Sequence, residues 1–281
     1  MTREAATLGH HHKASSFIMK INRQFSPHTW LMIGKTVFAV AAAVAIAMPM
    51  SGHAEDKSHP PVVVELFTSQ GCSSCPPANA NLIELSKRSD VLPLSFAVTY
   101  WDYLGWKDIF DKPEFTDRQV AYERPLGQPG PYTPQMVING VSTTVGNKLD
   151  VVEQLIGAAR PLSGPTVTLE PDTASIGAAT LSAAAADVWL VRYDPNLVEV
   201  PVARGENTGR TLPHTHVVHG LERLGGWSGA AVSFALPKAP GGLKTAILVQ
   251  ASNGGPILGA ATDSPEAQDH GHPDHSTGRA P

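Results

Sequence analysis

The stretch "ELFTSQGCSSCPPANANLIEL", residues 65–85, holds the only two cysteines of the chain, Cys72 and Cys75. The apolar run that overlaps its start, residues 60–69, predicts a buried strand, and residues 77–88 predict a helix with alanine and leucine on one face. A cysteine pair at such a junction can clasp the chain, contribute to a metal site or carry out redox chemistry. The remainder of the sequence helps to decide among these three.

The N-terminal segment, residues 1–54, has the pattern of a secretory signal peptide. A basic stretch leads into "TVFAVAAAVAIAMPM", residues 36–50, which is too short to span a bilayer comfortably. Small residues follow, so we expect cleavage after Ala54; an uncleaved N-terminal anchor is the alternative, and translation can also begin at Met19 or Met32. The signal peptide predicts a periplasmic or secreted protein, in which disulfides persist.

The charge of the mature chain excludes several classes of partner. Residues 55–281 hold 16 Lys and Arg against 24 Asp and Glu, a formal charge of −8. An acidic chain without a basic stripe is a poor nucleic-acid binder. No long apolar segment follows residue 54, so we expect no membrane contact in the mature form.

The pattern of elements predicts two domains of different class. Residues 55–160 alternate strand and helix patterns, with further helices expected over 112–124 and 147–160, which indicates a small α/β domain. Beyond "PLSGPT", residues 161–166, interpreted as a linker, short strand-like runs are separated by Gly, Pro and Asn. These runs predict a mainly antiparallel, sandwich-like β domain over residues 167–262, followed by a disordered tail over residues 263–281.

Two of the three interpretations of the cysteine pair account poorly for its position. A disulfide across so short a loop removes little entropy from the unfolded chain, roughly 2 kcal/mol, and is an inefficient clasp. A closed zinc site needs four ligands, and no second cysteine pair exists. His214 and His216 could complete such a set, because alternate residues of a strand share a face. A further cluster in the tail contains three histidines: His270, His272 and His275.

Redox chemistry accounts for the position best. A cysteine between a strand end and a helix N-terminus meets free backbone N–H groups and the positive end of the helix dipole, and both lower the thiol pKa. We therefore expect Cys72 to be the nucleophile and Cys75, in the first helical turn, to be the resolving thiol. Substrates would be protein or small-molecule thiols and disulfides, and no cofactor is needed.

The order strand, "GCSSCP", helix, strand, helix and "YTPQMVING" resembles the thioredoxin-like fold. The resemblance implies a cis peptide bond between Thr133 and Pro134, opposite the cysteines, with substrate backbone docking at Thr133; an ordinary trans proline in a turn is the alternative. It also implies that Glu65 serves proton transfer, although the family has aspartate at a slightly different spacing. An outward-facing strand carboxylate is the alternative for Glu65.

The whole chain also resembles an uncharacterised bacterial secreted family that joins a thioredoxin-like half to a β-rich half. The motifs are "ELFTSQGCSSCPPA" and "RGENTGRTLPHTHVV", residues 204–218, and the resemblance covers residues 60–262. We expect the second motif to pack against the first half through Arg–carboxylate pairs, with a ligand site as the alternative. The aromatic segment "YWDYLGWKD", residues 100–108, either forms a docking surface near the sulfurs or covers the core.

The sequence thus predicts an exported thiol–disulfide exchange protein without a defined direction of electron flow. Two alternatives stay open: a non-catalytic binding scaffold, and a copper- or zinc-handling protein that uses Cys72, Cys75, His214 and His216.

Overall fold

The computed structural model describes residues 60–180 and 185–263, all of which belong to one compact unit, Glu55–Pro281. The expected signal peptide, nearly all of the expected tail and the tail histidines lie outside the described residues and stay predictions. Within the described ranges, no helix combines the length and apolar character needed to cross a bilayer.

The described residues contain three α-helices and thirteen strands. The helices are α1 (Pro76–Leu85), α2 (Pro113–Glu123) and α3 (Leu149–Ala158), with a 3-10 turn at Asp102–Leu104. The first seven strands are β1 (Val62–Thr68), β2 (Val91–Ala97), β3 (Gln135–Ile138), β4 (Ser142–Thr144), β5 (Val167–Glu170), β6 (Thr173–Ile176) and β7 (Ala186–Asp194). The others are β8 (Val198–Pro201), β9 (Thr211–His214), β10 (Val217–Trp227), β11 (Val232–Ala235), β12 (Lys244–Ala251) and β13 (Ile257–Thr262).

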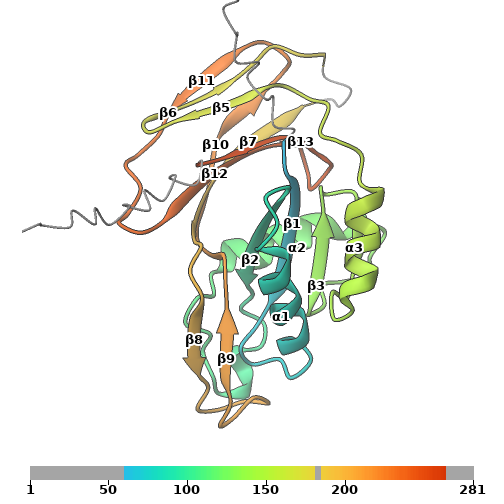
Figure 1. Ribbon diagram of the computed structural model, residues 1–281, viewed down its shortest axis with the longest axis vertical. Helices are drawn as coiled ribbons and strands as arrows, with labels where there is room; N and C mark the ends of the chain where they lie inside the picture. Colours follow the sequence, from blue (N-terminus) through green and yellow to red (C-terminus); the bar gives the residue numbers. More distant parts are fainter. Residues whose placement is uncertain (1–59, 181–184, 264–281) are drawn as a thin grey trace, which may run out of the picture. The chain divides into compact units, whose positions relative to one another are not determined.

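One mixed sheet of eight strands runs through both halves of the chain, in the order β13-β12-β7-β10-β2-β1-β3-β4 (Figure 1). The predicted fold class, a thioredoxin-like α/β domain followed by a separate β-rich domain, is therefore wrong. Strands expected to form an independent sandwich instead extend the sheet from β2. The predicted linker, residues 161–166, packs along this sheet, where the Gly164 N–H donates to the Leu258 carbonyl oxygen at 2.9 Å.

The two halves of the sheet join at a single bridge between β2 and β10. The strands are parallel there, Val217 pairs with Ser95, and the Ser95 N–H donates to the His216 carbonyl oxygen at 2.8 Å. Pro93 lies two residues before Ser95, so its nitrogen points toward the same edge but carries no hydrogen. Because the strands are parallel, Pro93 aligns with residues just before β10, so its missing N–H prevents the ladder from extending on that side of the bridge.

Alternation along β1 assigns its side chains to two cores. Val64 and Leu66 pack with α1 and α3, whereas Val63 and Phe67 pack with Phe115 of α2 on the other face. In Figure 1, α1 and α3 accordingly lie together on one side of β1 and β3, with α2 behind them. The helices thus cover both faces of this part of the sheet.

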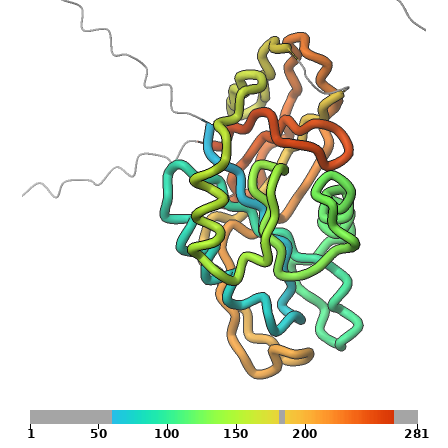
Figure 2. Tube along the Cα trace, turned by 90° about the vertical axis from the view of Figure 1, so that its right-hand side faces the viewer, coloured from blue at the N-terminus to red at the C-terminus, as the bar shows by residue number. Residues whose placement is uncertain are grey.

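Two smaller sheets complete the fold. Strands β11, β6 and β5 form a three-stranded sheet whose apolar side chains pack with Leu190, Ile247 and Trp227 of the main sheet. Strands β8 and β9 form a separate hairpin. Figures 1 and 2 both place this orange hairpin beside the cyan loop that follows β1.

The local elements of the first half match their predictions closely. Helix α2 occupies most of the range predicted for it, and β3 and β4 form a hairpin whose turn is Asn139-Gly140. Both turn residues have positive φ, 48° and 65°, as the type I′ turns favoured by Asn-Gly require.

Candidate functional site

The two cysteines lie at the junction of β1 and α1, and both are buried free thiols. Cys75 is the N-cap of α1, and Pro76 and Pro77 occupy the first turn, where the missing N–H groups have no helical partner in any case. Cys72 lies before the helix, in a turn that is closed by a hydrogen bond from its own N–H to the Ser69 carbonyl oxygen at 3.2 Å. The helix therefore begins one residue earlier than the sequence predicts.

Polar groups surround the Cys72 sulfur. Its Sγ lies 3.1 Å from Ser74 Oγ and 3.9 Å from the carbonyl oxygen of Thr133. The peptide bond between Thr133 and Pro134 is cis, as the resemblance implied. A hydrogen bond from Cys75 is the largest cause that lowers the pKa of Cys72 to about 6, with Ser74 and Thr133 adding to it against the opposing effect of burial.

Cys75 has the opposite electrostatic environment. Burial raises the pKa of the Cys75 thiol well above its usual value, and the neighbouring Cys72 raises it further. The Thr68 hydroxyl opposes this rise, because it can donate a hydrogen bond to a Cys75 thiolate. The pair is thus divided into one acidic thiol and one that holds its proton.

The loop between β8 and β9 lies on the backbone of the cysteine turn. Asn207, fully buried, donates through Nδ2 to the carbonyl oxygens of Gln70 at 2.9 Å and Cys72 at 2.8 Å. The carboxylate of Glu206 accepts hydrogen bonds from Ser73, from its N–H at 2.9 Å and its hydroxyl at 2.7 Å, which lower the pKa of Glu206. The motif packs against the first half as expected, but the contacts are those of the Asn207 amide and of Glu206 with Ser73 rather than Arg–carboxylate pairs.

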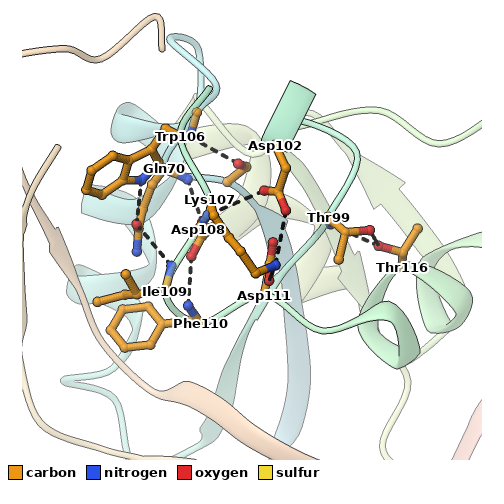
Figure 3. A network of polar contacts seen from close by, with 12 residues as sticks. Gln70, Thr99, Asp102, Trp106, Lys107, Asp108, Ile109, Phe110, Asp111 and Thr116 are labelled. Atoms are coloured by element: carbon orange, nitrogen blue, oxygen red, sulfur yellow. Dashed lines mark hydrogen bonds and ion pairs between the residues drawn. The ribbon is translucent and has the colours of Figure 1, made fainter. Parts of the chain in front are cut away.

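The aromatic segment supports the same turn from another side (Figure 3). Trp106 Nε1 donates to Gln70 Oε1 at 2.9 Å, and the Asp108 carboxylate accepts the Gln70 N–H at 2.7 Å. Burial raises the pKa of Asp108 to about 6. Trp101 Nε1 donates to Thr133 Oγ1 at 2.7 Å, beside the cis bond. The segment therefore positions the turn, while Tyr103, 79% exposed, faces solvent.

The chain matches the family model described as "Protein of unknown function (DUF1223)" over residues 63–250. It belongs to the DUF1223 family. The expected membership of an uncharacterised family is confirmed, whereas the thioredoxin-like half that the resemblance implied is not.

Two solved structures are similar to this DUF1223 chain. The crystal structure of protein AGR_C_4864 from Agrobacterium tumefaciens is 31% identical, with a TM-score of 0.61, over 74% of this chain and 97% of that one. HBP35 of Porphyromonas gingivalis is 17% identical, with a TM-score of 0.45, over 73% of this chain and 75% of that one. No curated protein sequence matches the chain.

Glu65 does not join the cysteines. Its side chain is fully buried on the α2 face of β1, where it accepts a hydrogen bond from Arg118 Nε at 2.5 Å and one from the Tyr122 hydroxyl. Gln250 and Tyr122 bond the remaining side of the Arg118 guanidinium. The Glu65 carboxylate is therefore held in an ion pair on the face of the sheet opposite α1. Because side chains alternate along a strand, Thr68 lies on the other face of β1, toward α1 and the cysteines.

The histidines of the metal alternative do not share a face. His214 ends β9 and faces Asn79 of α1, whereas His216 lies in the turn before β10 with φ of 49° and stacks on Tyr193. Burial lowers the pKa of each histidine to about 4. Across the residues that the structure describes, no three His, Cys, Asp or Glu side chains form a group that could hold a metal ion.

Sequence reasoning missed Thr68 and Asn79, which connect Cys75 to His214. Asn79 is only 3% exposed and lies on the same helical face as the buried Leu82. A polar residue on an apolar helix face was the available signal, since buried amides need hydrogen-bond partners.

Proposed function

We propose that this protein exchanges thiols with disulfides through Cys72 and Cys75. Cys72 thiolate attacks a substrate disulfide, which releases one substrate thiolate and leaves a mixed disulfide. Cys75 then attacks Cys72 Sγ, and the second substrate sulfur departs with the Cys75 proton. In the opposite direction, a substrate thiolate attacks the oxidised pair.

The asymmetry of the two sulfurs is the observation that carries this proposal. The nucleophile of thiol exchange is a thiolate, and a resting resolving thiol must keep its proton until the mixed disulfide has formed. Hydrogen bonds from Cys75 and Ser74 favour the Cys72 thiolate, while burial keeps Cys75 protonated. A purely structural pair needs no such division.

The surroundings of Cys72 also support a route for substrate backbone. The Thr133 carbonyl oxygen lies beside the Cys72 sulfur, and the Ser74 hydroxyl donates to that oxygen at 3.4 Å. A peptide that docked along Thr133 would bring its own sulfur close to Cys72. Because Cys72 is fully buried, docking has to displace neighbouring atoms before the sulfurs meet.

Alkylation of the reduced protein tests the nucleophile. With a pKa of about 6, half of Cys72 is thiolate at pH 6, about 150-fold more than for a free thiol of pKa about 8.5. Iodoacetamide at pH 6, followed by peptide mass spectrometry, should label Cys72 far ahead of Cys75. Equal, slow labelling with ordinary titration at both positions would refute the assignment of roles.

Equilibration with glutathione tests the function itself. Tryptophan fluorescence can report the redox state, because Trp101 bonds to Thr133 beside the cysteines. The wild-type protein should give one reversible two-electron transition, and Cys72→Ser and Cys75→Ser should each abolish it. A wild-type protein that never equilibrates with glutathione, or that instead retains stoichiometric zinc or copper on both thiols, contradicts the proposal.

A further inference from the structure

A line of buried polar side chains runs from Cys75 to the far side of α1. The Thr68 hydroxyl lies within hydrogen-bonding reach of Cys75 and donates to Asn79 Oδ1 at 2.9 Å. Asn79 Nδ2 lies 3.4 Å from His214 Nδ1. All three side chains belong to residues that are at most 3% exposed, so solvent cannot replace these hydrogen bonds. Three separate elements, β1, α1 and β9, supply them.

At rest, each donor of this hydrogen-bond chain points away from Cys75 and toward His214. Asn79 Nδ2 donates to the imidazole, so His214 accepts at Nδ1 and carries its proton at Nε2. Asn79 Oδ1 is then free to accept the Thr68 hydroxyl hydrogen. That hydrogen therefore points away from Cys75, which suits a protonated thiol but offers nothing to a thiolate.

The hydrogen-bond chain lacks a partner at its His214 end. His214 Nε2 is buried and has no hydrogen-bond partner in the described part of the chain. In the resting arrangement it is an unsatisfied N–H donor, which is costly in a buried place. If the proton sat on Nδ1 and the Asn79 amide were turned by about 180°, Nδ1 could donate to Asn79 Oδ1, and only a lone pair would be left unsatisfied at Nε2. The two arrangements are thus closely balanced.

We propose that Thr68, Asn79 and His214 form a reversible hydrogen-bond chain that stabilises Cys75 thiolate, with His214 as its positioning residue. On reversal, the Asn79 amide turns by about 180°, and a water molecule that reaches His214 when the site opens carries its proton from Nε2 to Nδ1. Nδ1 then donates to Asn79 Oδ1, Asn79 Nδ2 donates to Thr68 Oγ1, and the Thr68 hydroxyl donates to Cys75 Sγ. The chain gains and loses no proton.

The inference rests on the proposed thiol–disulfide exchange and concerns its second step. There the bond between Cys72 Sγ and the substrate sulfur breaks, and the bond between Cys75 Sγ and Cys72 Sγ forms. The electron pair leaves on the substrate sulfur, which takes the Cys75 proton. During this step Cys72 is no longer a thiolate that can accept from Cys75, so Thr68 is the group placed to stabilise the developing Cys75 charge.

Reaction of the reduced protein with 5,5′-dithiobis(2-nitrobenzoate) separates the two steps. Attack by Cys72 releases the first thionitrobenzoate and leaves a mixed disulfide, and attack by Cys75 releases the second. In Thr68→Val and His214→Leu, the second release should slow at least about tenfold, the loss expected for one hydrogen bond to a charged group. Its rise with pH should also move to higher pH, because the Cys75 thiolate is less stable.

Conservative and matched variants distinguish this role from general damage. Thr68→Ser keeps the hydroxyl, and His214→Asn presents an amide that can accept or donate, so both should restore the second release. Thr215→Val is the control. Thr215 is also buried, but its hydroxyl donates to the Pro195 carbonyl oxygen, which is not part of the Thr68–Asn79–His214 hydrogen-bond chain. Each variant is used only after circular dichroism shows a cooperative melt, and Thr68→Val with Thr68→Ser suffices if His214→Leu does not fold.

The outcomes separate the two proposals. A second release in Thr68→Val within twofold of wild type, at every pH, overturns the hydrogen-bond chain and leaves thiol exchange standing. A wild-type first release no faster than that of a free thiol at the same pH overturns thiol exchange, and with it the chain.

Discussion

Replacing Asn207 by alanine should both destabilise the fold and uncover Cys72. Its side chain is fully buried, and its Nδ2 joins the carbonyl oxygens of Gln70 and Cys72 at 2.9 and 2.8 Å. Its Oδ1 also accepts from Arg210 Nη1 at 2.8 Å. The substitution therefore removes three hydrogen bonds and takes this donor from the Gln70 carbonyl oxygen, whereas the Cys72 carbonyl oxygen still accepts from the Cys75 N–H at 3.2 Å.

The expected loss follows from those three contacts. A protein hydrogen bond contributes roughly 0.5–1.5 kcal/mol net, and an unsatisfied buried acceptor costs about 1–3 kcal/mol, so the free energy of unfolding should fall by about 3 kcal/mol. For a chain of this size, each kcal/mol lowers Tm by about 2–4 °C, which gives about 6–12 °C. Thr208→Ala is the control, because Thr208 is exposed and should cost less than about 0.5 kcal/mol.

Urea denaturation measures the first effect and iodoacetamide labelling the second. Since Asn207 holds the β8–β9 loop on the Cys72 carbonyl, its removal should accelerate Cys72 labelling in the folded protein, whereas Thr208→Ala should not. If Asn207→Ala matched Thr208→Ala in both measurements, the loop could not be anchored as described.

Two further predictions concern buried ionisable side chains. Arg118→Met leaves the fully buried Glu65 carboxylate without its cation and should lower the free energy of unfolding by about 3–5 kcal/mol. Adding Glu65→Gln to this variant should recover much of the lost stability. Urea denaturation measures both effects, and a double variant less stable than Arg118→Met would contradict the prediction. Asp108, with a pKa of about 6 raised by burial, binds its proton more tightly in the folded state. Its contribution to stability is therefore largest below the unfolded pKa and is lost as pH rises through about 6. The stability of wild type relative to Asp108→Asn should thus fall between about pH 4 and 6, and a rise over that range in parallel melts would show the wrong sign.

Much of the first half could be predicted from local sequence signals, whereas the long-range pairing of strands could not. Asn139-Gly140 determined its own turn, and Pro113 opens α2 near the predicted position. Strand β10 is different, because its register shifts between Val218 and Gly220 and again between Arg223 and Gly225. Each bulge moves the following side chains to the other face, so the alternation that would identify one long strand is lost. The sequence therefore predicts short strands of a separate sandwich rather than one long strand.

The candidate site divides in the same way. The cysteine spacing and the strand before it identified Cys72 and Cys75, since both signals lie within one short stretch. Interpreting "HTHVVH" as a strand put His214 and His216 on one face, but the positive φ of His216 ends that strand after His214. Which residues a distant hairpin brings to the sulfurs depends on tertiary structure, and no local pattern specifies it.

The junction that joins the two halves of the sheet also delivers the second half of the site. Strand β9 ends at His214, and three residues later Val217 pairs with Ser95 of β2. That bridge fixes the hairpin beside α1, so that His214 meets Asn79 and, at the other end of the hairpin, Asn207 meets the cysteine turn. A fragment ending at residue 160 would keep both sulfurs but lose these contacts and expose the edge of β2. The family model spans residues 63–250, so it contains the two cysteines together with the β8–β9 hairpin that contacts them, and not the cysteine-bearing half alone.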